Sequence, residues 1–336
     1  MLSKIYEKIK IFIKENYKFI LSLIAIVFLL TYELPYVVYT PGGIVNLEKR
    51  ISVKNGYDSK GSINMSYVTL RKGNIPSILL SYVIKDWDLL KESEVTGSDE
   101  SVDDLLKLEK LYMTSSIDNA TILAYKKANK KINIKKNINN VIYVSENAKT
   151  DISLYDIILS VDGKDINNIK ELQDYIKTKN EGDTVYFKVI SNKKEVDRKA
   201  EVININGELK VGIAFLTTYE YETDPSITVK TKSSESGSSG GLMLSLAIYN
   251  AITKEDITKG KTIVGTGTID VLGNVGKIDG VKYKILGAVK NKADLFICPK
   301  DNYDEAMKVK KEHNLNINII SVETFDEAIN YLENNL

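Results

Sequence analysis

The chain has 336 residues, which is enough for two or three domains and a sizeable buried core. Apolar residues make up 43% and charged residues 27%, and these fractions exclude bulk disorder and a multi-span membrane protein. The 46 basic and 45 acidic residues nearly cancel, and one cysteine, Cys298, and one histidine, His313, leave no intrachain disulfide and no conventional zinc site. The composition therefore predicts neither a nucleic-acid partner nor a metal.

The first forty residues have the pattern of a membrane anchor. Residues 19–32 are apolar and uncharged, five lysines precede them, and the apolar character resumes after Glu33. This pattern predicts a cytoplasmic N-terminus over 1–18, a transmembrane signal anchor over 19–38, and a catalytic or binding part on the extracytoplasmic side of the cell membrane. A cleaved signal peptide and a buried core helix are the alternatives.

The next segment, residues 39–135, mixes strand and helix patterns. Pro41-Gly42-Gly43 predicts a turn at the exit from the membrane. Short alternating apolar runs over 44–72 predict strands, and helical spacing predicts helices over 76–92 and 101–130. The acidic stretch Glu92–Asp103, which contains serine and glycine, predicts an exposed loop.

Residues 138–206 have the pattern of a small strand-rich module, with one amphipathic helix between strands. The order Asp156-Ile-Ile-Leu-Ser-Val-Asp-Gly-Lys164, helix, Gly182-Asp-Thr-Val185, strand resembles a PDZ domain. The resemblance implies a PDZ-like, strand-rich domain over 136–212 that grips a peptide by strand addition. It carries over no binding residue, because Tyr155 stands where the family usually has glycine.

From residue 213 the pattern changes to alternating strands and helices. The expected elements are strands at 227–231, 262–265, 295–298 and 317–320 and helices from 242, at 282–291, 303–312 and 325–334. The fold class that the sequence predicts is a multi-domain α/β (α+β) chain with an N-terminal transmembrane helix.

The stretch Ser233-Ser-Glu-Ser-Gly-Ser-Ser-Gly-Gly-Leu-Met joins a strand to an apolar helix through a Ser/Gly loop. Three interpretations compete: a phosphate-binding loop, a serine nucleophile with an oxyanion hole, and a plain capped helix. A nucleophile needs a base, and His313 lies among lysines at a predicted solvated helix end. A lysine with a lowered pKa is the remaining base, and Lys284 opens the apolar part of a helix. Many other lysines leave that choice open.

Two motifs resolve the choice by resemblance. Gly237-Ser238-Ser239-Gly240-Gly, followed about 45 positions later by Gly280-Val-Lys-Tyr-Lys284, resembles the proteolytic domain of Lon-type serine proteases. The resemblance covers 213–336 and implies that Ser239 is the nucleophile, Lys284 the general base, and Thr266 the residue that supports the lysine.

The same resemblance implies that backbone N–H groups of Gly237, Ser238 and Gly240 form the oxyanion loop. The sequence departs from the family pattern at three places. Ser238 replaces the usual proline, Gly240 the usual alanine, and Asp279 the first glycine before the lysine.

The whole chain, with Tyr39-Thr-Pro-Gly-Gly43, Met113-Thr-Ser-Ser-Ile-Asp-Asn-Ala120 and the PDZ-like insert, resembles membrane-anchored, PDZ-containing Lon-like proteases of bacteria. The resemblance implies a membrane-anchored serine endopeptidase that cleaves peptides or exposed protein segments. The sequence has no P-loop. The nearest string ends in Gly260-Lys261-Thr262, and Glu255 stands where its first glycine would have to be. We therefore expect cleavage without ATP, and neither a bound nucleotide nor a cofactor. A catalytically inactive, membrane-tethered PDZ peptide-binding protein is the alternative, and a homo-oligomer stays open because Lon domains assemble into rings.

Overall fold

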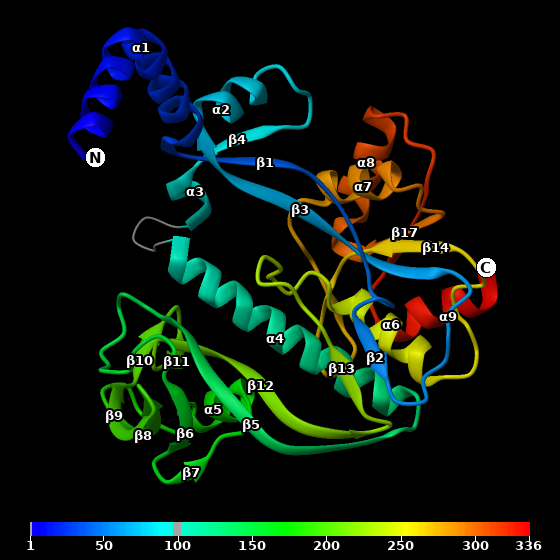
Figure 1. Ribbon diagram of the computed structural model, residues 1–336. Coiled ribbons are helices and arrows are strands. Elements are labelled where there is room, and N and C mark those ends of the chain that lie inside the picture. The colour runs from blue at the N-terminus through cyan, green and yellow to red at the C-terminus, as the bar shows by residue number, and fades with distance from the viewer. Residues whose placement is uncertain (1, 97–101) are drawn as a thin grey trace.

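The computed structural model describes residues 2–96 and 102–336. Figure 1 shows two bodies joined by a pair of long strands: a mixed sheet covered by helices, and a smaller strand-rich part. Helix α1 (Leu2–Thr31) lies at the end of the larger body that is remote from the smaller one.

The larger body is built on a six-stranded sheet in the order β18-β17-β14-β3-β1-β4. The first four strands run parallel, and β1 runs antiparallel to both β3 and β4. The strands are β18 (Asn318–Val322), β17 (Leu295–Pro299), β14 (Thr262–Gly265), β3 (Ser62–Asn74), β1 (Glu33–Asn46) and β4 (Asp88–Lys91).

Helices cover both faces of this sheet because successive strand residues point to opposite sides. In β17, Leu295 and Ile297 join the core under one helix layer, and Phe296 and Cys298 join the core under the other. The first layer contains α4 (Val102–Lys127), α6 (Gly241–Ile252) and α9 (Phe325–Asn335). The second contains α7 (Val281–Lys290) and α8 (Tyr303–Glu312), which follows the 3-10 turn η1 (Lys300–Asn302).

The larger body draws on both ends of the chain. β1 and β3 share its sheet with β14, and α4 packs on α6, so residues before the PDZ-like insert complete the core of the part predicted over 213–336. Two small ladders close its periphery. They pair β2 (Ile51–Val53) with β13 (Ile227–Val229) and β15 (Thr268–Ile269) with β16 (Val275–Gly276).

The smaller body is a strand-rich sheet with its own apolar core. Its path is β12-β5-β6-β8-β9, with β7 paired to β6 and a separate β10–β11 hairpin. The elements are β5 (Lys131–Val144), β6 (Ile157–Val161), β7 (Lys164–Asp165), α5 (Ile169–Ile176), β8 (Thr184–Ser191), β9 (Lys194–Glu201), β10 (Ile203–Ile205), β11 (Glu208–Lys210) and β12 (Ile213–Asp224).

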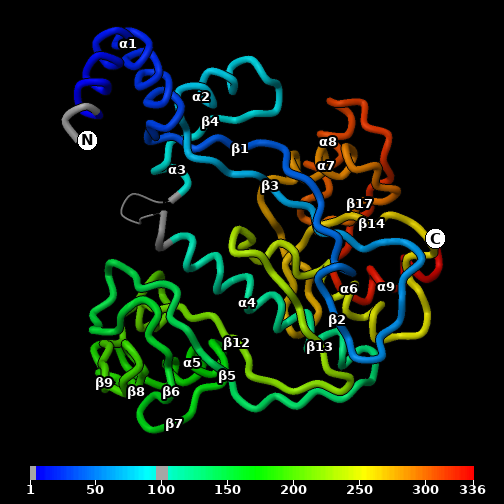
Figure 2. Tube along the Cα trace, viewed as in Figure 1, coloured from blue at the N-terminus to red at the C-terminus, as the bar shows by residue number. Residues whose placement is uncertain are grey.

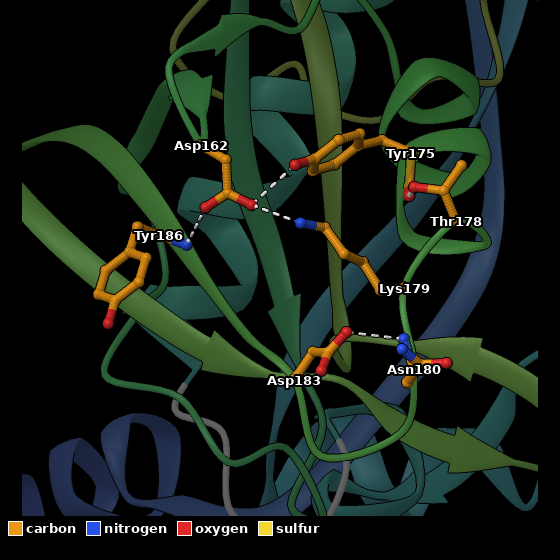
Figure 3. Close-up of polar contacts among 7 residues, drawn as sticks. All are labelled: Asp162, Tyr175, Thr178, Lys179, Asn180, Asp183 and Tyr186. Atoms are coloured by element: carbon orange, nitrogen blue, oxygen red, sulfur yellow. Dashed lines mark hydrogen bonds and ion pairs between the residues drawn. The ribbon is translucent and has the colours of Figure 1, made fainter.

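One carboxylate ties the single helix of this body to its strands (Figure 3). Asp162 accepts hydrogen bonds from the Tyr175 hydroxyl at 2.8 Å, the Lys179 ammonium at 3.0 Å and the Tyr186 backbone N–H at 2.8 Å. Although partial burial opposes the shift, these donors hold the pKa of Asp162 below its ordinary value.

The elements predicted after residue 240 are confirmed to within two residues at most boundaries. The single helix predicted over 76–92 is wrong: α2 (Ile75–Ser81) is followed by β4 and by the short α3 (Glu92–Thr96). α3 also replaces the first part of the loop predicted over 92–103, of which residues 97–101 lie outside the described residues.

The predicted transmembrane helix over 19–38 is also corrected. α1 ends at Thr31, and residues 33–38 begin β1, because Pro35 disfavours helix at the preceding residue and the β-branched Val37 and Val38 favour strand. Among the described residues, no helix combines the length and the apolar character that crossing a membrane requires.

Pro41-Gly42-Gly43 is a bulge inside β1 and not the predicted turn. The register between β1 and β3 shifts there, and a Cβ on Gly42 would lie 2.0 Å from the Tyr67 carbonyl oxygen. The same bulge contacts α7, where a Cβ on Gly287 would lie 3.4 Å from the Gly42 backbone. The glycines therefore let β1 and α7 approach closely.

Candidate active site

The Ser/Gly loop enters α6 in a conformation fixed by hydrogen bonds of its backbone groups, two of them to α4. Gly237 has φ 91°, a left-handed value that favours glycine, and its N–H donates to the Glu109 carbonyl at 2.9 Å. The Ser238 carbonyl accepts from the Ser116 hydroxyl at 3.1 Å and from the Gly241 N–H at 3.1 Å. Ser239 is thus held at the N-terminus of a buried helix.

Gly240, one of the departures from the family pattern, is packed against β3. A Cβ there would lie 2.7 Å from the Met65 sulfur, so the larger methionine fills the space that an alanine would take.

Thr266 connects the serine loop to Lys284. Its hydroxyl donates to the Ser239 carbonyl at 3.0 Å and accepts from the Lys284 ammonium at 3.0 Å. The Gly267 N–H donates to the same Ser239 carbonyl at 2.8 Å. Because the Thr266 proton is already donated, this hydroxyl can only accept from the lysine, and a neutral amine keeps its lone pair for another proton.

Lys284 is buried without a bonded carboxylate. Lys284 is 4% exposed, and its ammonium donates to the Thr266 hydroxyl. Burial lowers the pKa of the Lys284 ammonium to about 8, and the more distant Asp279 carboxylate opposes this shift. The neutral amine is therefore accessible near neutral pH, as a general base requires.

The start of α7, which carries the lysine, is fixed at several points. Gly280 caps α7 with φ 72°, a left-handed value. Asp88 of β4 accepts from the Lys282 ammonium at 2.8 Å and from the Tyr283 hydroxyl. These bonds and the Gly42–Gly287 contact set the depth at which Lys284 lies under the serine loop.

A cavity of about 470 Å³ opens above the serine. Ser239, Gly240 and Gly237 form one wall. The opposite walls come from β1, β3 and α4 and include Ile44, Val45, Asn46, Met65, Val68 and Met113. Polar side chains from the turn after β1 and from the segment before the serine loop complete the lining: Lys49, Arg50, Lys232 and Glu235. Its size and mixed lining suit a peptide side chain.

The expected oxyanion loop needs one correction. The Gly237 N–H donates to Glu109 and is not directed into the cavity. Among the described residues, the N–H groups of Ser238, Ser239 and Gly240 donate to no backbone acceptor. Ser238 does not line the cavity, so Ser239 and the predicted Gly240 are the candidates beside it to hold an oxyanion.

Sequence reasoning missed the part that α4 plays in holding this loop. Besides the Glu109 and Ser116 bonds, the Asn119 amide donates to the Ile269 carbonyl at 3.2 Å, just after Thr266 and Gly267. The available signal was the run Met113-Thr-Ser-Ser-Ile-Asp-Asn-Ala120, in which small polar residues occupy buried helix positions. Buried hydroxyl and amide groups need specific partners.

An adjacent side of α4 contacts the PDZ-like body. The Ser115 hydroxyl donates to the Thr217 carbonyl at 3.0 Å, and the Asp118 carboxylate accepts from the Tyr219 N–H at 2.9 Å. Both partners are backbone groups of β12, the edge strand of that sheet, so α4 covers part of this edge. Of two adjacent residues in α4, Ser115 therefore contacts the PDZ-like body and Ser116 contacts the serine loop of the larger body.

His313 takes no part in the site. It pairs with Asp86 at 3.4 Å, is partly buried and does not line the cavity. A serine-histidine arrangement is therefore absent around Ser239 in the described residues.

Comparison with known families agrees with this geometry. Residues 229–334 match the Lon protease (S16) C-terminal proteolytic domain, and residues 135–202 match the PDZ domain. The chain therefore contains both domain types, and the first supports a serine peptidase.

Curated relatives match over the proteolytic part. The Lon protease of Campylobacter jejuni is 31% identical over 96 residues, 28% of this chain and 12% of the relative. That of Metamycoplasma arthritidis is 33% identical over 29% of this chain and 11% of the relative, and the archaeal Lon protease of Archaeoglobus fulgidus is 30% identical over 29% and 15%. The chain thus spans less than a sixth of the length of these relatives.

Among solved structures, the PDZ domain of an SdrC-like protein from Listeria monocytogenes matches at 21% identity, covering 25% of this chain and 93% of that one, with a TM-score of 0.23. The PDZ domain of the SdrC-like protein from Listeria innocua matches at 27% identity over 23% and 92%, with a TM-score of 0.22.

Asp118 gives a test of the contact between α4 and β12. Burial raises the pKa of its carboxyl to about 6, so the folded protein binds a proton there more readily than the unfolded chain. The free energy of unfolding should therefore fall as pH rises from 4 through 6. Asp118→Asn keeps an acceptor for Tyr219 without the charge, so its stability advantage over wild type should be about 1 kcal/mol smaller at pH 5 than at pH 7.

Urea unfolding at the two pH values measures this difference, with the exposed Asp174→Asn as control. An advantage that stays constant or grows toward pH 5 would contradict the assignment.

Proposed function

We propose that this protein is an ATP-independent serine endopeptidase in which Ser239 is the nucleophile and Lys284 the general base. The observation that carries the proposal is the buried lysine amine, joined to the serine loop through the Thr266 hydroxyl. The match of residues 229–334 to the Lon proteolytic domain supports the reaction class.

In the proposed reaction, neutral Lys284 accepts the Ser239 proton as the serine oxygen attacks the scissile carbonyl. Backbone N–H groups of Ser239 and Gly240 stabilise the tetrahedral oxyanion, a contribution of roughly 3 kcal/mol per donor in other serine proteases. The Lys284 ammonium then protonates the leaving amine. Water, activated by the same lysine, hydrolyses the ester on Ser239 and regenerates the hydroxyl.

The substrates we infer are peptides or exposed protein segments in extended form. β4 pairs with β1 only over residues 36–39, and in the described part of the chain no strand covers the same edge over 40–46. Ile44, Val45 and Asn46 of that edge line the cavity beside Ser239. Main-chain groups on an open strand edge are suited to bind an extended peptide.

We also propose that the chain is attached to a membrane through α1. Support comes from its second half, where large apolar side chains around the helix, including Leu23, Val27 and Phe28, are about half exposed. A helix that is apolar on all sides requires apolar surroundings. An extracytoplasmic catalytic part stays a prediction, supported by the lysines that precede Phe19.

The dyad is tested with substitutions that spare the fold. Ser239→Ala and Lys284→Ala should each abolish cleavage of a complex peptide library, read as new termini by mass spectrometry, because one removes the nucleophile and the other the base. Lys290→Ala, an exposed lysine on the same helix, should cleave like wild type. Near wild-type cleavage by either dyad variant would contradict the assignment of that residue. A wild-type protein without activity would favour a PDZ-type peptide-binding protein.

The pH dependence tests the base separately. Cleavage should rise with pH and level off above about 8, since only the unprotonated Lys284 amine accepts the serine proton. Asp279→Asn removes the charge that favours the ammonium form, so its profile should shift to lower pH. A profile that is flat from about pH 5 to 9, or an Asp279→Asn shift to higher pH, would argue against this base.

Membrane attachment is measured by vesicle flotation of the full chain. Leu23→Glu with Val27→Glu should abolish flotation because both charges fall in the apolar half of α1. The matched pair Ile9→Glu with Ile13→Glu lies in the lysine-rich half of α1 and should leave most of the flotation intact. Equal flotation of the two paired variants would contradict attachment through the apolar half.

A further inference from the structure

A second apolar surface lies outside the active site, at the end of α2. Leu79, Leu80, Tyr82, Val83 and Ile84, five of six consecutive residues, are exposed, and Val83 reaches 82%. Nothing in α2 itself is buried. Large apolar side chains that gather on a surface mark an interaction site, and we call these five residues the α2 patch.

Helix α2, which ends at the α2 patch, is tied at its start to the apolar half of α1. Asn74 caps α2 by accepting from the Ser77 N–H at 3.0 Å, and its amide donates to the Leu30 carbonyl of α1 at 2.7 Å. One side chain therefore fixes the start of α2 to the last turn of α1. In Figure 2 both helices lie at the same end of the β1–β3 pair, away from the PDZ-like body.

We propose that the α2 patch inserts into the surface of a lipid bilayer beside α1 and so gives the protein a second membrane contact. The inference rests on the attachment through α1 proposed above. A protein groove would cover one side of α1, whereas its apolar side chains are exposed on all sides, which suits lipid. The α2 patch adds an aromatic residue, Tyr82, and is followed at once by Lys85, a combination suited to the headgroup boundary.

Two contacts restrict the orientation of the protein. α2 extends directly from β3, and β3 carries Met65 and Val68 of the cavity wall. Fixing both α1 and α2 at the bilayer would therefore set the direction in which the cavity faces the membrane surface, which a single flexible anchor would leave free.

The single tryptophan, Trp87, lies close to the α2 patch in sequence and makes the test direct. In the full chain, Val83→Trp with Trp87→Phe places the only indole on the α2 patch. Vesicles of phosphatidylcholine and phosphatidylglycerol should shift its emission to shorter wavelength, and brominated acyl chains should quench it. The matched control, Tyr186→Trp with Trp87→Phe, puts the indole on an exposed position of β8, and its emission should not change.

Flotation of the same samples separates the two proposals. Flotation without quenching at position 83 overturns the α2 contact and leaves attachment through α1 intact. Loss of flotation in every variant, wild type included, overturns the attachment itself. A spectral shift at position 83 that depends on protein concentration and not on vesicles assigns the α2 patch to a second copy of the chain and also overturns the lipid contact.

Discussion

The structure depends on burying one amine without pairing it to a carboxylate. A lysine in apolar surroundings is costly while charged, so burial lowers its pKa toward neutrality, and the amine needs a single well-placed partner. Thr266 is that partner, and its proton is already committed to the Ser239 carbonyl. The burial of Lys284 therefore depends on the close approach of α7, which carries it, to β1. Gly42 and Gly287 permit the close approach of the two elements, and Lys284 is buried on the same helix.

Helix α4 meets a second requirement, because the proteolytic part is interrupted in sequence by the PDZ-like body. Its buried polar residues point in two directions. Ser116 and Asn119 hold the serine loop and the strand after Thr266, while Ser115 and Asp118 hold the edge of β12. A helix with only an apolar stripe would pack but would not fix the two bodies in register. The buried hydrogen bonds supply that specificity, since each would be costly to leave unmade.

Much of the proteolytic part was predictable from sequence, because its strands and helices alternate with clear periods and end at glycine, asparagine or proline. The serine loop, Thr266 and Lys284 were likewise placed by their motifs, and the structure brings the three together. The N-terminal half was harder. The apolar character resumes just after Glu33, and only Pro35 with the β-branched Val37 and Val38 indicates that the helix gives way to strand. The sharing of the sheet by β1 and β3, and the role of α4, depend on contacts between residues more than a hundred positions apart, which periodicity does not encode.

The paired strands β5 and β12 have a structural consequence. Lys131 and Asp224 are partners in the ladder, so the inserted body leaves and re-enters the chain at almost the same place. α4 binds it through the Thr217 carbonyl and the Tyr219 N–H, main-chain groups that any residue supplies, except that proline lacks the N–H. The inserted body is therefore connected to the larger body at one pair of strands and by contacts to its backbone. Replacing the insert by another module or by a short hairpin would leave the hydrogen bonds within the larger body in place.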